Sequence, residues 1–335
     1  MNIRETMEQW ERQNLSPYAS LSSEALGRDR EEPLCDIRPA YQRDRDRILH
    51  SKSFRRLKDK TQVFLAPEGD HYRTRLTHTL EVSQIARTIA KALRMNESLT
   101  EAIALGHDLG HTPFGHAGEY ILNEICEDGF AHYKQSVRVV EILEKKGQGL
   151  NLTKEVRDGM LNHRTSGNPA TMEGKIVRFS DKIAYINHDI DDAIRGKIIT
   201  ERDIPREYAD VLGDTVKDRL NIMIHDIINN SMDRPSIFMS PDVERAMRGL
   251  REWMFEHVYR NPAAKGEEGR AQQLIVTLYE YYLKHVDELP DEYLAMMELR
   301  GEKRERVVCD YIAGMSDGYA IDRFEELFVP KGWNV

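Results

Sequence analysis

The chain has 335 residues, enough to bury a sizeable core as two domains or as one large helical domain with an extension. Its formal net charge of −9 argues against a general nucleic-acid-binding protein, because phosphate contacts need a basic surface. The three cysteines are odd in number and far apart, which excludes a disulfide framework and a CxxC metal site.

The N-terminal part of the chain gives no sign of a membrane partner. Its first residues are polar, and no apolar run anywhere approaches the ~20 residues that a membrane span requires. We therefore expect a cytoplasmic protein. Residues 1–36 are charged and loosely patterned, with a short helix predicted from Ile3 to Gln13, and we interpret them as an N-terminal arm.

Cations recur between Arg43 and Lys60 in the segment IRPAYQRDRDRILHSKSFRRLKDKTQVF, where a helix is predicted from about Asp44 to Lys52. A solvated cationic helix face explains such a run as well as a functional role does. The functional alternative is a contact to a multi-phosphate substrate, since the planar guanidinium group binds phosphate oxygens in pairs.

A long amphipathic helix begins within PEGDHYRTRLTHTL. After His78, apolar residues follow at intervals of four, three and four, at Val82, Ile85 and Ile89. His78 therefore points inward. Alone, a histidine on an apolar face is more often a hydrogen-bonded core residue than a ligand, so both interpretations stay open at this point.

The stretch ALGHDLGHTPFGHAGE, residues 104–119, contains His107, Asp108, His111 and His116. A surface helix has no reason to gather imidazoles beside a carboxylate. A divalent metal and a phosphate, by contrast, need nitrogen ligands, a hard oxygen and a proton donor. We interpret this stretch as an active site.

One helix is predicted from Ser98 to Gly110, and a short second one from about Gly118. Glycine and proline residues in between let the backbone turn tightly, which can bring His116 back toward the first helix. Glu119 then lies one turn beyond His116.

Two further amphipathic helices are predicted, over residues 130–146 and over a segment that ends near His163. His132 lies at the start of the first of these helices, where a helix N-terminus favours anions. For His163, an ordinary structural role is favoured over a role as a ligand.

The segment GKIVRFSDKIAYINHDIDDAIRG, residues 174–196, predicts a helix with Asp181 on its core-facing line. Unpaired burial of this carboxylate would cost several kcal/mol, so Asp181 should meet a cation, and a metal ion satisfies it most simply. Lys182 would then face whatever anion the metal holds.

Beyond Gly196 the pattern stays helical, in blocks separated by prolines. We expect an all-α fold with a core over residues 37–200 and a helical C-terminal region, residues 201–335, packed on it. Strand-like alternation is rare. KTQVF and the tail LFVPKGW are the only stretches that suggest strands, and they could pair as one short β-hairpin.

His78, His107, Asp108 and Asp181 form a set of two histidines and two carboxylates spread over three predicted helices. Borderline nitrogen and hard oxygen ligands suit Mn, Fe, Mg, Co or Ni better than a closed structural zinc site, which would want thiolates. The sequence therefore predicts a divalent metal site with open positions for water and substrate.

At this point the chain resembles a known family, the HD-domain metal-dependent phosphohydrolases, and within it the deoxyguanosinetriphosphate triphosphohydrolase-like branch. The phrases that carry the resemblance are YQRDRDRILHSKSFRRLKDKTQVF, TRLTHTLEV, GHDLGHTPFGHAGE, RFSDKIAYINHDIDD and DYIAGMSDGYA. They cover the chain from about residue 37 to residue 328. The resemblance implies an all-α HD-domain core.

The resemblance also implies roles for individual residues. It makes His78, His107, Asp108 and Asp181 the metal ligands. It suggests phosphate binding by Arg75, Lys182 and Tyr185, a deoxyribose contact for Asp189, catalytic roles for His111, His116 and His132, and a weaker phosphate role for Arg55 and Arg56.

The implied reaction is attack of a water activated at the metal site on the α-phosphorus of a dNTP. The products would be a deoxynucleoside and triphosphate. The leaving alkoxide needs a proton, and a histidine near its ordinary pKa of ~6.5 suits that task. We favour His116 as the acid, because Glu119 could hold its ring and raise its basicity. His132 is the competing candidate.

Two other functions stay open. One is an HD-type nucleotidase or phosphodiesterase acting on other nucleotides, although a monophosphate would need fewer cations. The other is a regulatory protein that binds nucleotides or single-stranded DNA and uses its metal structurally, supported only by the cationic run. The family also implies a homo-oligomer, for which the helix IVTLYEYYLKHV could be a contact surface or ordinary core.

Overall fold

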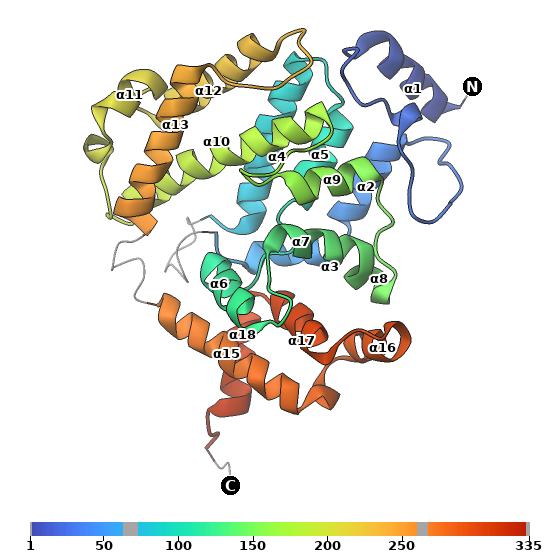
Figure 1. The fold of residues 1–335 in the computed structure, drawn as a ribbon, viewed down its shortest axis with the longest axis vertical. Helices are drawn as coiled ribbons and strands as arrows, with labels where there is room; N and C mark the ends of the chain where they lie inside the picture. The colour runs from blue at the N-terminus through green and yellow to red at the C-terminus, as the bar shows by residue number, and fades with distance from the viewer. Residues whose placement is uncertain (1, 63–72, 260–266, 333–335) are drawn as a thin grey trace.

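The computed structural model describes residues 2–62, 73–259 and 267–332 (Figure 1). The helices up to residue 195 are α1 (Ile3–Asn14), α2 (Ala40–Leu49), α3 (Lys52–Arg56), α4 (Arg75–Ala92), α5 (Glu97–Gly106), α6 (Gly115–Ile125), α7 (His132–Arg138), α8 (Glu144–Gly147), α9 (Lys154–Asn162) and α10 (Met172–Arg195). Those that follow are α11 (Arg206–Leu212), α12 (Val216–Ser231), α13 (Pro241–Met254), α15 (Glu268–Lys284), α16 (Asp291–Arg300), α17 (Arg304–Ala313) and α18 (Asp317–Phe328).

The predicted all-α class is confirmed, whereas the predicted hairpin is wrong for the residues that the structure describes. Thr61 forms an isolated antiparallel bridge with Thr74, which lies directly before α4. The other half of the expected hairpin is unavailable, because Leu327 and Phe328 end helix α18. Residues 63–64 and 333, which belong to the two predicted strands, lie outside the described residues.

Helices α4, α5, α9 and α10 lie together in one hydrophobic core. The predicted spacing on α4 is confirmed, since Val82, Ile85 and Ile89 are all buried in this core. Residues of α13, such as Leu250 and Met254, belong to the same core. We call it the first core.

A second core lies below it in Figure 1 and joins α6 to α15, α16, α17 and α18. It includes Leu122 of α6 and Ile312 of α17, both fully buried. On α15, Leu278, Tyr279 and Tyr282 are buried in the same core. Core packing therefore accounts for the buried face of this tyrosine-rich helix.

The helix boundaries around the active-site stretch differ from the prediction. Helix α5 begins at Glu97 because the side chain of Asn96 accepts hydrogen bonds from the backbone N–H groups of Ser98 and Leu99. It ends at Gly106, so the following histidine and aspartate lie in a turn rather than on the helix. Helix α6 starts at residue 115, three residues earlier than expected.

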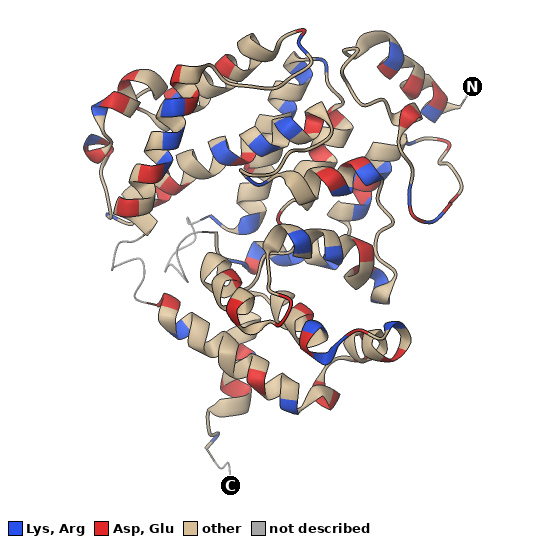
Figure 2. Cartoon of the chain, viewed as in Figure 1, with Lys and Arg blue, Asp and Glu red and all other residues tan. Residues whose placement is uncertain are grey.

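Acidic and basic side chains are interleaved over the helices (Figure 2). The arginines of α2 have carboxylate partners: Arg45 pairs with Asp46 and Glu101, and Arg47 pairs with Glu32. The early part of the cationic run is therefore neutralised locally, which weakens the case for nucleic-acid binding. Among the described residues, no helix is both long and apolar enough to cross a membrane.

Candidate active site

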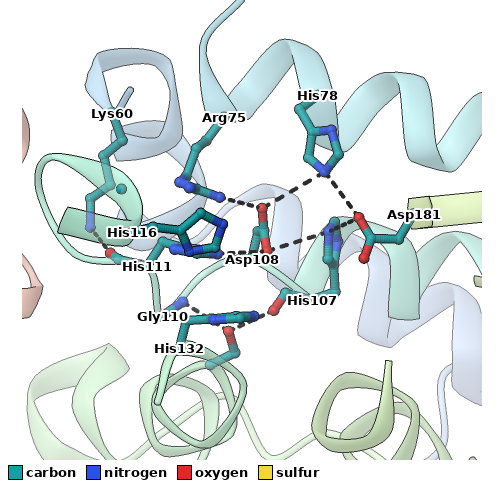
Figure 3. Close-up of polar contacts among 12 residues, drawn as sticks. Lys60, Arg75, His78, His107, Asp108, Gly110, His111, His116, His132 and Asp181 are labelled. Carbon is teal, nitrogen blue, oxygen red and sulfur yellow. Dashed lines mark hydrogen bonds and ion pairs between the residues drawn. The ribbon is translucent and has the colours of Figure 1, made fainter. Parts of the chain in front are cut away.

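The four predicted metal ligands converge at one place (Figure 3). His78 comes from α4, His107 and Asp108 follow the end of α5, and Asp181 lies on α10. His78 Nε2 is 3.2 Å from Asp181 Oδ1, and His107 Nε2 is 3.8 Å from the same oxygen. The Asp108 carboxylate is 4.0 Å from His78 Nε2 and 3.4 Å from His107 Nε2. All but Asp181 are nearly inaccessible to solvent.

The tautomer of His107 shows what this set can hold. Its Nδ1 lies 2.6 Å from the carbonyl oxygen of Ala104, which can only accept, so Nδ1 carries the proton. In the neutral ring Nε2 presents a lone pair, and among the described residues it has no hydrogen-bond partner. It faces the carboxylates of Asp108 and Asp181, an arrangement that needs a cation between the electron-rich atoms. The residues present fit a divalent ion with nitrogen and oxygen ligands.

Both carboxylates stay ionised, although Asp108 is buried and Asp181 is largely so. Burial alone would raise the pKa of Asp108, but the neighbouring histidines and Arg75 outweigh it and hold that pKa well below its usual range. Burial acts in the same way on Asp181, and the hydrogen bond from His78 reverses it, so the pKa of Asp181 is also lowered. Two anionic oxygens are therefore ready to bind a metal at neutral pH.

Glu119 of α6 holds two of the predicted catalytic histidines. Its Oε1 lies 2.8 Å from His132 Nδ1 and also accepts the backbone N–H of His132 at 2.8 Å. Its Oε2 lies 3.3 Å from His116 Nδ1. The His132 side chain is 16% exposed, whereas that of His116 is 79% exposed. Glu119 thus lies closer to His132 than to His116, although the sequence favoured His116 as the acid.

The pKa values within this group move in opposite directions. Burial would lower the pKa of His132, but the hydrogen bond and charge of Glu119 outweigh burial and raise it. Burial lowers the pKa of His111 well below its usual range, and Arg75 lowers it further. The two rings stack at a centroid distance of 4.0 Å, so a neutral His111 supports a protonated His132.

The turn between α5 and α6 depends on a close backbone approach at Gly110. A Cβ atom there would lie 2.1 Å from the backbone nitrogen of Ser136 on α7. Ser136 Oγ accepts the Gly110 N–H at 2.9 Å and donates to the carbonyl oxygen of His107 at 2.7 Å. Glycine is therefore required for α7, which carries His132, to pack against the turn that carries two of the predicted metal ligands.

A cleft of about 730 Å³ opens beside the metal ligands and is within the size range of ligand-binding pockets. Several predicted residues line it: Arg75, His78, Asp108, His111, His116, His132, Asp181, Tyr185 and Asp189. Arg75 is buried and its Nη1 lies 2.8 Å from Asp108 Oδ2. The structure therefore brings Arg75 directly to the metal set.

Three polar side chains form one wall of the cleft. The Tyr259 hydroxyl donates a hydrogen bond to Asp189 Oδ2. Asp189 Oδ1 and the Tyr185 hydroxyl are buried and have no hydrogen-bond partner among the described residues. Burial raises the pKa of Asp189 to about 7. Buried polar atoms without partners are costly, so this wall is suited to binding a polar ligand.

Three of the predicted substrate-binding residues are not among the described residues that line the cleft. Arg55 is exposed, and Arg56 donates a hydrogen bond to Ser53 Oγ at 3.1 Å. Lys182 lies on α10, with its Nζ 5.5 Å from the ring centroid of Phe179. Burial and the nearby Arg178 lower the pKa of Lys182 to about 8.

Sequence reasoning missed other residues of the cleft: His163, Arg164, Arg251, Phe255 and Tyr259. The guanidinium of Arg164 stacks 4.3 Å over the Tyr133 ring and donates to its hydroxyl at 2.8 Å. Arg251 lies 5.9 Å over the ring of Tyr185. Arg164 directly follows a histidine in a glycine-containing loop, which was a usable signal, whereas no local pattern connects Arg251 to the site.

His163 combines the structural role that was predicted with a place in the site. Its Nδ1 lies 2.7 Å from the carbonyl oxygen of Met160, which leaves Nε2 unprotonated. That Nε2 is 3.3 Å from His132 Nε2. His163 can therefore accept a hydrogen bond from a protonated His132.

The comparisons with known proteins agree with this geometry. The family model for the HD domain matches residues 75–186, and the model for the phosphohydrolase-associated domain matches residues 237–326. A relative from Caldanaerobacter subterraneus subsp. tengcongensis is 57% identical over 99% of this chain and 98% of its own length. A relative from Clostridium perfringens strain SM101 is 48% identical over 99% of each chain. Both are named deoxyguanosinetriphosphate triphosphohydrolase-like protein.

A solved structure of a hypothetical protein from Aquifex aeolicus also matches, with 21% identity and a TM-score of 0.48. The match covers 86% of this chain and 68% of that chain.

Proposed function

Because this chain belongs to the deoxyguanosinetriphosphate triphosphohydrolase-like family of HD-domain phosphoric-ester hydrolases, we propose that it converts a dNTP to deoxynucleoside and intact triphosphate. The observation that carries the proposal is the convergence of His78, His107 and Asp108, with Asp181 beside them, next to a cleft that also holds arginines and a histidine bonded to a carboxylate. The name of the relatives does not fix the base of the substrate, so dGTP and the other dNTPs are all candidate substrates.

A divalent ion would be held by His78, His107, Asp108 and Asp181. When bound, it would act as a Lewis acid that lowers the pKa of a water and withdraws charge from a phosphoryl oxygen. Mn, Mg, Fe, Co and Ni all suit this ligand set.

The phosphate tail would be balanced by arginines. Arg75, Arg164 and Arg251 line the cleft, and the stacking of Arg164 on Tyr133 limits the freedom of its guanidinium. Arginine binds phosphate oxygens in pairs through its planar fork. Three such groups suit a triphosphate better than a monophosphate, which supports the proposed substrate over the nucleotidase alternative. Lys182 stays a weaker candidate because of its place outside the cleft lining.

The sugar would lie against the wall formed by Tyr185, Asp189 and Tyr259. The unpartnered Asp189 Oδ1 could accept a hydrogen bond from a deoxyribose hydroxyl, and the unpartnered Tyr185 hydroxyl could donate or accept one. Substrate binding would thereby satisfy buried polar atoms that otherwise lack partners.

The leaving 5′ oxygen needs a proton, and the geometry favours His132 as its source. Glu119 orients the His132 ring and raises its pKa, so the imidazolium is available near neutral pH. His111 stacks on this ring. The Nε2–H of His132 faces His163 Nε2 at 3.3 Å, and this proton would pass to the leaving oxygen when substrate replaces that contact. His116 is the second candidate, because it shares Glu119 but is largely exposed.

The direct test is to incubate the purified protein with each of the four dNTPs and with Mn, Mg, Co or Ni, and to separate the products by chromatography. We expect deoxynucleoside and intact tripolyphosphate in equal amounts. Asp108→Ala should abolish the reaction, whereas Asp128→Ala, at an exposed aspartate, should not. Release of orthophosphate or pyrophosphate would contradict the proposal and favour another nucleotide hydrolase.

A homo-oligomer, a cytoplasmic location and weak binding of single-stranded DNA stay predictions. Light scattering coupled to size exclusion would give the subunit number. A salt titration of DNA binding by the Asp108→Ala variant would test the DNA-binding alternative, because binding through phosphate contacts weakens steeply with salt.

A further inference from the structure

The turn between α5 and α6, residues 107–114, joins the two hydrophobic cores. The metal ligands His78 and Asp181 lie on helices of the first core, whereas His116 and Glu119 lie on α6, which packs in the second core. The turn formed by residues 107–114 connects the two groups. The distance from the metal site to Glu119, and to the histidine that Glu119 holds, therefore depends on how this turn is fixed.

Phe114, the last residue of the turn, has an unusual backbone conformation. Its φ is +62°, in the left-handed region that costs energy for a residue other than glycine. Helix α6 begins at Gly115, whose φ of +57° is also positive, so these two residues together set the direction in which α6 leaves the turn.

Asp317, the first residue of α18, fastens this position. Its Oδ1 accepts the Phe114 backbone N–H at 2.9 Å. Its Oδ2 accepts the backbone N–H of Thr61 at 2.9 Å and also the Thr61 hydroxyl. One carboxylate from the C-terminal region thus ties the turn to the segment before α4.

Lys60 provides a second tie at the same place (Figure 3). Its buried Nζ donates to the carbonyl oxygen of His111 and to that of Ala313, the latter at 2.9 Å. Ala313 ends α17, so the amino group of Lys60 joins the turn between α5 and α6 to the second core.

We propose that Asp317 is a positioning residue, which holds the left-handed Phe114 turn so that α6 presents Glu119 and His116 to the metal site. Lys60 supports the same turn at the carbonyl oxygen of His111. The proposal rests on the proposed function for the reaction that is affected, whereas the contacts of Asp317 do not depend on that function. It gives the C-terminal region a part in turnover, although that region contributes none of the predicted metal ligands.

An ordinary structural role for Asp317 makes different predictions. A residue needed only for stability would, when replaced, lower the fraction of folded enzyme and leave the kcat of the folded fraction unchanged. A positioning residue would lower kcat in folded enzyme with metal binding intact, and its effect would depend on the conformation of Phe114.

The test measures kcat, KM and bound metal for Asp317→Ala, with Asp322→Ala as the control at an exposed aspartate of the same helix. We expect Asp317→Ala to lower kcat by at least about tenfold, with KM and metal content changed less than about threefold, because misplaced acid–base groups act on the transition state. Asp322→Ala should behave as wild type.

A double-mutant cycle with Phe114→Gly makes the test specific. Glycine adopts a positive φ without the cost that Phe114 bears, so its turn depends less on the anchoring carboxylate. We expect Asp317→Ala to cost at least about threefold less kcat in the Phe114→Gly background than in wild type. If Asp317→Ala does not fold, Asp317→Asn, which keeps one acceptor oxygen, replaces it in the same cycle.

Three results would each overturn the positioning role. They are an unchanged kcat in folded Asp317→Ala, a loss of bound metal together with activity, and an equal loss of kcat in the wild-type and Phe114→Gly backgrounds. The cycle can be run on any nucleotide that the wild type hydrolyses. Failure of the cycle while the wild type releases triphosphate would therefore count against Asp317 alone, and failure to release triphosphate would count against the proposed function alone.

Discussion

The two cores of this protein build the candidate site in different ways. In the first core, apolar stripes on α4, α5 and α10 pack together, and the four predicted metal ligands lie on α4, on α10 and in the turn that follows α5. The second core reaches the site through polar contacts, in which Asp317 and Lys60 hold the turn and Glu119 holds His132 on α7. The difference suggests that metal binding and proton transfer can be perturbed separately.

The largest effect is expected on the metal side. Asp181→Ala removes a predicted ligand and the carboxylate that lies 3.2 Å from His78 Nε2, so metal affinity and turnover should fall together. Loss of several kcal/mol of transition-state stabilisation corresponds to about a 10³-fold decrease in kcat/KM. Metal content by mass spectrometry and kinetics check this, with Asp210→Ala, at an exposed aspartate, as control. Activity without bound metal would refute the assignment.

Replacement of His132 or His116 should separate proton transfer from metal binding. We expect His132→Gln to lower kcat about 10²-fold, within the range for general acid–base catalysis, while bound metal is retained. His116→Gln should cost less than about tenfold, because its ring is exposed and farther from Glu119. Steady-state kinetics at saturating metal measure both. A larger loss for His116→Gln would restore the original choice of acid.

A pH profile should show the contact between the cores. A general acid must be protonated, so activity declines as pH rises through the pKa of His132, which Glu119 raises. Glu119→Gln removes that charge and lowers the pKa of His132, so the decline of kcat should begin at lower pH, with a loss of about tenfold at pH 8. An unshifted basic limb would exclude His132 as the titrating acid.

The smallest effect concerns the substrate wall rather than either set of catalytic groups. The pKa of Asp189 is raised to about 7, whereas an unfolded aspartate titrates near 3.9. Between these values the folded state binds more protons, so this residue contributes less stability as pH rises from 5 to 8.

Asp189→Asn should remove that dependence. The free energy of unfolding of the variant, relative to wild type, should rise with pH by a few kcal/mol at most, at ~1.4 kcal/mol per pKa unit. Urea unfolding of metal-free protein at pH 5 and pH 8 measures the difference. Equal differences at the two pH values would show that Asp189 is ionised throughout.

The sequence alone predicted the all-α class and the four residues that converge as the candidate metal set. Both depend on local information, since helical spacing placed His78 and Asp181 on inward faces and the unusual cluster of histidines marked His107 and Asp108. The four residues also match the motif of the family. The predicted start of α5 at Ser98 was wrong because Asn96, two residues earlier, caps the helix through its side chain.

The family resemblance also named residues that line the cleft, such as Arg75, His132 and Asp189, but only the tertiary structure decided how the other groups meet. Several contacts join distant parts of the chain. Glu119 lies closer to His132 than to His116, and Arg251 and Tyr259 line the cleft. Lys60 and Asp317 contact the turn between α5 and α6. Such contacts are fixed by how the two cores pack, and no helical period encodes them. The sequence therefore determined which residues could bind a metal, and the fold determined which residues accompany it.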